Sequence, residues 1–124
     1  MNTEALVDYL ARNGFGVKGK TLFGVAMPGR VHEGILVLNN TPITRHPYQK
    51  GRRDGHFQVV VRGTEFTSIQ SKARAIAELL DTEGLQIGDM KFLSVRPVAE
   101  PFIYPRTDGN LLEASVNFNF VYVI

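Results

Sequence analysis

A basic cluster between residues 45 and 55 is the first feature of the sequence that could do chemistry. The stretch reads RHPYQKGRRDG, and its cationic and aromatic side chains are Arg45, Tyr48, Lys50, Arg52 and Arg53. Cations bind phosphates and an interleaved ring can stack on a base, as in proteins that bind single-stranded nucleic acid. One aromatic residue is a small stacking platform, and a charged run of this length is also typical of a solvated loop. Both interpretations stay open from these residues alone.

Groups suited to metal binding or catalysis are scattered along the chain. The sequence has no cysteine, which excludes disulfides, thiolate catalysis and cysteine-bound metals. His32, His46 and His56 have no metal-ligand spacing, and we interpret them as exposed polar residues at strand ends and in a loop. No G-x-S-x-G or H-E-x-x-H motif is present. We therefore expect a non-enzymatic protein without a cofactor or a metal ion.

The composition is that of an ordinary soluble domain. The 124 residues are 44% hydrophobic and 21% charged, which predicts one domain over residues 1–124. The formal net charge of +2 is too small for the whole surface to bind a polyanion, so any electrostatic role depends on the basic cluster. No apolar run has the length of a signal peptide or a membrane helix, and we expect synthesis in the cytosol.

Two segments have the apolar periodicity of helices. In the first, Leu6, Val7 and Leu10 form one stripe, and Gly14 provides a stop. The second follows the strand-like stretch FQVVVRG and ends before Gly84. Its apolar face comprises Phe66, Ile69, Ala73, Ile76, Ala77 and Leu80. Each helix is expected to pack against a sheet.

The remaining apolar runs predict strands. TLFGVAMPG and HEGILVLNN are separated by the turn signal Pro28-Gly29, and HFQVVVRG alternates with period two. KFLSVRPVAEPFIY is interrupted by Pro97 and Pro101, so it should bend or lie at a sheet edge. PRTDGN predicts a turn with Asp108-Gly109 at its tip. EASVNFNFVYVI ends the chain as a long apolar strand, expected at the sheet centre or at a subunit contact.

A segment without periodicity, residues 41–55, separates the second strand from the third. It contains Pro42, Pro47, Gly51 and Gly55, and it predicts a loop of about fifteen residues, a length usual for functional or disordered loops. The order of elements predicts an α+β fold, in which a mainly antiparallel sheet packs against two helices. The basic cluster lies within the predicted long loop.

The run FQVVVRGTEFTSIQSKARAIAELL and the elements around it resemble the minor capsid and tail terminator (tail completion) proteins of long-tailed bacteriophages. The shared features are a V-x-V-R-G-like strand end, an A-x-x-x-A helix, a proline-containing strand and a last strand with alternating aromatics. In this chain they are Val59, Val61, Arg62, Gly63, Ala73, Ala77, Pro97, Phe118 and Phe120. The resemblance in element order covers most of the chain, and residues 14–40 depart from it most.

The resemblance implies a non-enzymatic virion protein that forms a ring, typically a hexamer, at the head-proximal end of the tail. Such a ring ends polymerisation of the tail tube and joins the tail to the head. The implied partners are the protein itself, the tail tube protein, the head-connector protein and passing DNA, without a membrane, and assembly takes place in the cytoplasm of the host bacterium. Arg45, Tyr48, Lys50, Arg52 and Arg53 would then contact a neighbouring subunit, the tube or DNA.

A second hypothesis comes from the basic cluster without the resemblance. In it, the protein is a small nucleic-acid-binding module that uses Arg45, Lys50, Arg52 and Arg53. Because such binding releases counterions, its affinity should fall steeply with salt. This dependence on salt separates the second hypothesis from a role in protein assembly alone.

Overall fold

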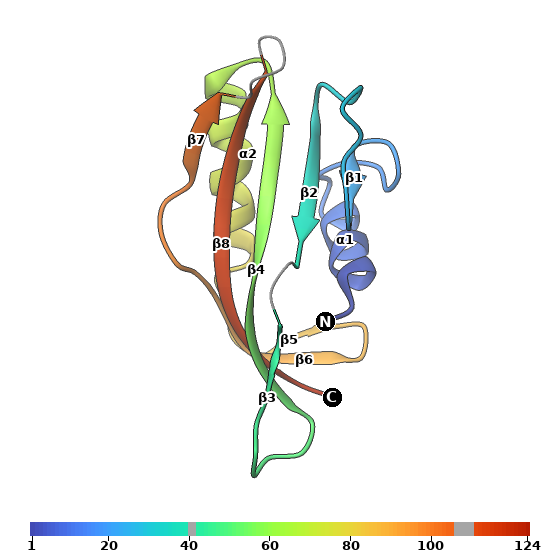
Figure 1. Cartoon of the computed structure of the whole chain (residues 1–124), viewed down its shortest axis with the longest axis vertical. Helices are drawn as coiled ribbons and strands as arrows, with labels where there is room; N and C mark the ends of the chain where they lie inside the picture. The colour runs from blue at the N-terminus through green and yellow to red at the C-terminus, as the bar shows by residue number, and fades with distance from the viewer. Residues whose placement is uncertain (40–41, 106–110) are drawn as a thin grey trace.

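The computed structural model describes residues 1–39, 42–105 and 111–124, which form two helices and a sheet (Figure 1). Their order along the chain is α1 (Thr3–Arg12), β1 (Leu22–Phe23), β2 (Gly34–Leu38), β3 (Thr44–Arg45), β4 (Arg52–Gly63), α2 (Phe66–Leu79), β5 (Leu85–Ile87), β6 (Met90–Pro97), β7 (Phe102–Pro105) and β8 (Leu112–Val123). The predicted α+β fold is confirmed.

The sheet is mainly antiparallel. Within the described residues it has eight strands in the order β1-β2-β4-β8-β6-β5, with β3 added to β4 and β7 added to β8. Only β1 and β2 pair in parallel there. The longest pairing joins β4 to β8, from Arg52 opposite Val123 to Gly63 opposite Leu112. The last strand therefore lies at the sheet centre, which was one of its two expected positions.

The proline-rich strand bends, as its sequence predicts. β6 ends at Pro97 and β7 begins after Pro101, yet both strands pair with the same edge of β8. The Val98 amide donates a hydrogen bond of 2.7 Å to the Asn117 carbonyl at the bend. One interrupted strand thus runs along β8 and leaves the sheet over residues 98–101. The turn predicted at Asp108-Gly109 lies outside the described residues.

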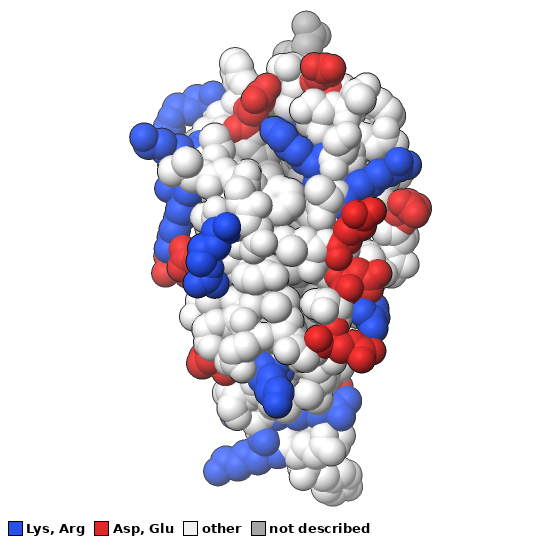
Figure 2. Space-filling model, turned by 180° about the vertical axis from the view of Figure 1, so that it is seen from behind, with Lys and Arg blue, Asp and Glu red and all other residues white. Residues whose placement is uncertain are grey.

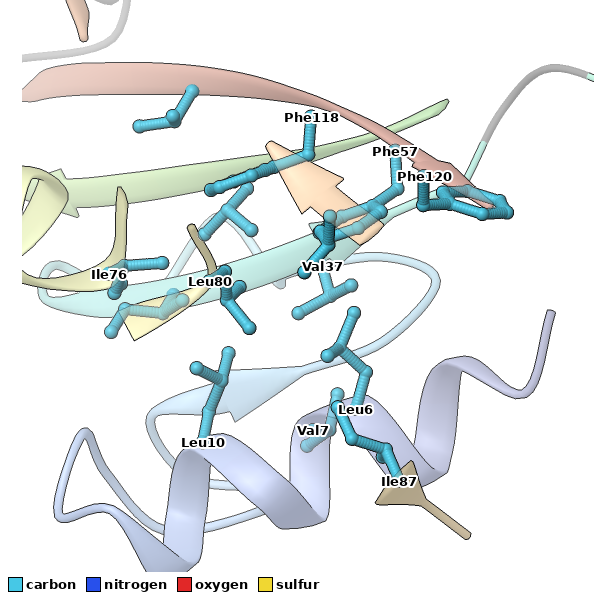
Figure 3. Close-up of a cluster of buried hydrophobic side chains, with 14 of the residues drawn as sticks. Leu6, Val7, Leu10, Val37, Phe57, Ile76, Leu80, Ile87, Phe118 and Phe120 are labelled. Carbon is cyan, nitrogen blue, oxygen red and sulfur yellow. The ribbon is translucent and has the colours of Figure 1, made fainter. Parts of the chain in front are cut away.

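Both helices cover one face of the sheet and share one core. α2 packs against β4 and β8, and α1 packs against β1, β2 and β5. Figure 3 shows side chains of α1, α2 and the strands converging, and the Phe57 and Phe118 rings stack with centroids 4.9 Å apart. Full burial of one such apolar side chain contributes about 1.5–3 kcal/mol to the stability of the fold. The residues that anchor α1 and α2 in this core are Leu6, Val7, Leu10, Ile69, Ala73 and Ile76.

Local signals set the ends of α1. The Asn2 side chain accepts a hydrogen bond of 3.1 Å from the Ala5 amide, which satisfies one of the free donors at the helix start. Gly14, with φ of +83°, follows the helix and ends it as predicted. Neither helix of the described chain has the length and hydrophobicity needed to cross a membrane.

Two predictions about the strands before β4 need correction. The first predicted strand is reduced to Leu22–Phe23, because the chain leaves the sheet before the turn at Pro28, where the Val31 amide donates to the Pro28 carbonyl at 3.1 Å. The predicted loop over residues 41–55 is wrong in part. β3 lies within it, and β4 begins at Arg52, so that residues 44–54 form a β-hairpin.

Candidate interaction site

The hairpin of residues 44–54, called the basic hairpin below, carries all five predicted contact residues. Figure 1 shows it projecting at the lower end of the molecule, beyond both helices. Its strands pair through Thr44 opposite Asp54 and Arg45 opposite Arg53. Its second strand also pairs with the end of β8, which fixes the hairpin to the sheet.

Backbone contacts order the hairpin tip. His46 Nδ1 accepts hydrogen bonds from the amides of Tyr48 at 3.2 Å and Gln49 at 3.0 Å. The Arg52 amide donates to the Gln49 carbonyl at 3.1 Å, and the His46 amide donates to the Arg52 carbonyl at 3.3 Å. His46 is half-buried and supports the turn. Its spacing to the other histidines, the criterion for a metal site, does not predict this role.

Gly51 ties the hairpin to the end of β8. Its φ of +89° lies in the left-handed region, and a Cβ at this position would lie 2.9 Å from the Ile124 carbonyl oxygen. The Ile124 amide donates a hydrogen bond of 3.1 Å to the Gly51 carbonyl. Glycine is required here both by its backbone conformation and by the close approach of the chain end.

Arg45 and Arg53 place two positive charges directly opposite each other. The register puts both side chains on the same face of the hairpin, an arrangement that destabilises the isolated strand pair. Within the described residues, neither arginine forms an ion pair with a carboxylate, and neither does Lys50 at the tip. Tyr48 is 92% exposed beside them. These four side chains are available to a partner.

Arg52 has a different role from the other three cations. It lies on the opposite face, where its Nε donates to Asp54 Oδ1 at 3.1 Å and its Nη1 donates to Gln49 Oε1 at 3.0 Å. These contacts join the tip to the start of β4 and partly neutralise the arginine. Asp54 and Gln49 thus belong to the site, and no sequence signal short of the hairpin register identifies them.

Tyr122 of β8 lies opposite Arg53 at the base of the hairpin. Its side chain is 5% exposed, and this burial raises the pKa of the Tyr122 phenol above its ordinary value. The positive charge of Arg53 acts in the opposite direction and lowers the same pKa, whereas Asp89 raises it. The basic hairpin is therefore coupled electrostatically to the sheet that holds it.

Arg62, the arginine of the V-R-G sequence, lies outside the hairpin. It is buried, and its Nε donates to Glu113 Oε2 at 3.0 Å. Its Nη1 donates to the carbonyls of Pro28 at 2.9 Å and Val31 at 3.0 Å. Arg62 thereby holds the turn between β1 and β2 against β4 and β8. The arginine of the V-x-V-R-G-like strand end therefore serves to hold the fold together.

The site is suited to binding. Guanidinium and ammonium groups bind carboxylates and phosphates, and the exposed ring adds an apolar contact. No group of three or more His, Cys, Asp or Glu side chains in the described parts of the chain could hold a metal ion. The geometry thus supports recognition of a negatively charged partner.

Comparisons with known proteins agree with this architecture. A family model described as "Bacteriophage tail terminator protein" matches residues 9–124. Among solved structures, the chain is similar to one from the "Virion of native gene transfer agent (GTA) particle", with a TM-score of 0.67 over 86% of this chain and 81% of the other. The two sequences are 11% identical, so this similarity concerns the fold. No curated protein sequence matches the chain.

Proposed function

The chain belongs to the bacteriophage tail terminator family, and on this basis we propose that it caps the tail tube as a ring. The ring, a homo-oligomer and typically a hexamer, ends polymerisation of the tube and forms the interface between tail and head. The observation that carries the proposal is the family match, which spans residues 9–124 and so includes nearly all of the fold.

The proposed partners are the tail tube protein, the head-connector protein and further copies of the chain. The protein acts at the head-proximal end of the tail after assembly in the host cytoplasm, and its role is geometric, without bond chemistry. We also propose that residues 1–124 form one domain, which the single core shared by both helices supports. The basic hairpin, with Arg45, Tyr48, Lys50, Arg52 and Arg53, supplies contacts to one of these partners.

Growth of tail tubes tests the proposal. Tube protein is polymerised with and without the purified chain, and tube lengths and ends are examined by electron microscopy. We expect shorter tubes that carry a ring at one end when the chain is present, because a bound ring removes the surface to which tube subunits add. Tubes of equal length without an added ring would contradict the proposal.

A second candidate function is contact with DNA through the basic hairpin, favoured by the opposed pair Arg45 and Arg53. Replacing Arg45, Lys50, Arg52 and Arg53 by Ser should abolish salt-dependent DNA binding. A matched control replaces four exposed cations elsewhere, namely Lys20, Arg30, Lys72 and Lys91. Equal DNA binding by the two variants would exclude a specific role for the hairpin.

A further inference from the structure

A groove lies between the exposed side of α2 and the bend that connects β6 to β7. Its volume is about 650 Å³. Ala77 from α2 and Pro97, Ala99 and Pro101 from the bend form the apolar part of its lining. This explains a difference within the A-x-x-x-A pattern, since Ala73 is fully buried in the core whereas Ala77 is only half-buried and lines the groove.

Acidic side chains dominate the charge of the groove. Glu78, Asp81 and Glu100 line it, against the single cation Arg74. Asp81 accepts a 2.9 Å contact from Arg96, but in the described part of the chain neither Glu78 nor Glu100 forms an ion pair. Figure 2 shows acidic side chains gathered along the side of the molecule that carries α2, and Lys or Arg side chains at the hairpin end.

The basic hairpin complements this groove in both charge and polarity. It presents Arg45, Lys50 and Arg53 without carboxylate partners among the described residues, and Tyr48 of the same hairpin is exposed. Guanidinium groups pair with carboxylates in bidentate geometry, and a tyrosine ring packs on alanine and proline surfaces. An occupant with cations around one aromatic ring therefore matches a groove in which alanine and proline side chains lie beside acidic ones.

The hairpin lies at one end of the molecule, whereas α2 and the bend at residues 97–101, which line the groove, lie along one side (Figure 1). The hairpin therefore reaches a groove only on another copy. A contact between two different surfaces of identical subunits repeats from subunit to subunit, and it closes into a ring when the rotation allows. The repeated contact would also separate the opposed arginines from bulk solvent by placing acidic groups beside them.

We propose that the basic hairpin of one subunit docks into the groove between α2 and residues 97–101 of the next subunit. The proposal rests on the proposed function, because it names the contact that would hold the ring together. It assigns Glu78 and Glu100 as the carboxylates that receive Arg45 and Arg53. It also assigns the hairpin to another copy of this chain in preference to the tube protein or DNA.

Charge exchange tests the contact. One variant carries Arg45→Glu and Arg53→Glu, a second carries Glu78→Arg and Glu100→Arg, and a third combines all four. Ring mass is measured by light scattering after size exclusion, and on capped tubes by electron microscopy. We expect each reversal to weaken subunit association at least tenfold, and the combined variant to recover most of the loss, because it restores opposite charges across the contact.

Controls separate the contact from general effects of charge and folding. A control variant with Lys20→Glu and Lys91→Glu changes the net charge by the same amount as the hairpin reversal. Both positions lie outside the hairpin and the groove, so this variant should leave subunit association unchanged. Circular dichroism establishes that every variant is folded. Unchanged ring mass in both reversals, or no recovery in the combined variant, would overturn the proposed contact while ring formation by the native chain still supported the proposed function.

A cross-linking measurement gives a second, independent result. The native chain has no cysteine, so Lys50→Cys and Ala99→Cys introduce the only two thiols. With a short bismaleimide reagent on capped tubes, the double variant should form a ladder of covalent multimers, whereas either single variant stops at dimers. Capped tubes without a ladder would overturn the docking contact. If the Arg45→Glu and Arg53→Glu variant keeps the ring mass but no longer caps tubes, the hairpin contacts the tube instead. Failure of the native chain to cap tubes would refute the proposed function itself.

Discussion

At the scale of single residues, Arg62 is the only charged side chain that is buried in the described parts of the chain. Burying an ion pair is costly unless further hydrogen bonds satisfy the remaining donors. Arg62 meets this condition through Glu113 and two backbone carbonyls from the turn at residues 28–31. Its position therefore depends on three separate segments of the fold, and removing it affects all three.

Replacement of Arg62 by Ala should be strongly destabilising. It removes a buried partner of Glu113 and the donor to two carbonyls, and we expect the free energy of unfolding to fall by about 3–5 kcal/mol. Arg96→Ala is the matched control, because Arg96 also contacts two acidic residues but is 46% exposed, and its loss should cost less than about 1 kcal/mol. Urea denaturation measures both. Similar losses of stability in the two variants would show that Arg62 does not hold the turn at residues 28–31 against the sheet.

Tyr122 predicts a dependence of stability on alkaline pH. The pKa of Tyr122 is raised in the folded state, so below about pH 10 the phenol stays protonated in both the folded and the unfolded chain. At such pH values the stability of the fold is not reduced by ionisation of Tyr122. As the pH rises above this value, the unfolded chain ionises first, and stability is lost until the folded phenol also ionises. Tyr122→Phe should weaken this alkaline loss, measured as the urea midpoint between pH 9 and 11. Identical pH profiles for the native chain and the variant would contradict the prediction.

At the scale of elements, the sequence predicts best where burial imposes a period. In α2, Ile69, Ala73 and Ile76 recur at helical spacing and are all buried. In β8, Phe118 and Phe120 alternate with exposed Asn117 and Asn119, as a half-buried strand requires. These elements, and with them the α+β class, follow from the local order of residues.

The basic hairpin shows what local order cannot predict. Residues 52–56 read RRDGH and have no apolar alternation, and this part of β4 lies beyond both helices (Figure 1). Their strand structure depends on backbone pairing with β3 and with the end of β8, about seventy positions away in sequence. The sequence therefore predicted the composition of the site, while its conformation depends on the distant end of β8. The difference between Arg52 and the other cations follows from the hairpin register, which places Asp54 and Gln49 beside Arg52.

Gly51→Ala should loosen the hairpin without unfolding the protein. The φ of +89° costs a non-glycine residue about 1–2 kcal/mol, and the new Cβ would approach the Ile124 carbonyl. Gly14→Ala is the control, since Gly14 has a φ of +83° with open space around it. We expect a larger loss of stability for Gly51→Ala and faster hydrogen exchange at the Ile124 amide. Unchanged exchange there would show that Gly51 does not hold the chain end.

At the scale of the whole molecule, the sheet curves until its two edges approach the same helix. α1 contacts β1 and β2 near one edge and β5 at the other. The approach is close, because a Cβ on Gly88, between β5 and β6, would lie 3.2 Å from the Cβ of Ala5. The helix thereby closes the open side of the curved sheet, and the two helices contribute to one core.

This arrangement predicts cooperative unfolding of the whole chain. Leu10→Ala in α1 and Ile76→Ala in α2 remove fully buried side chains from the shared core, and each should cost about 2–5 kcal/mol. Far-ultraviolet circular dichroism and tyrosine fluorescence should give coincident transitions in both variants. Leu93→Ala, at a side chain 44% exposed, is the control with a small effect. Two separated transitions would indicate that α1 and α2 belong to independent units.

The hydrogen bond between Ile124 and Gly51 has a practical consequence for handling the protein. Whatever is attached after Ile124 starts beside the basic hairpin, so an affinity tag there would obstruct the surface that we assign to assembly. The same proximity is useful for detection, since a small fluorophore linked to Ile124 would change its emission when the hairpin meets a partner.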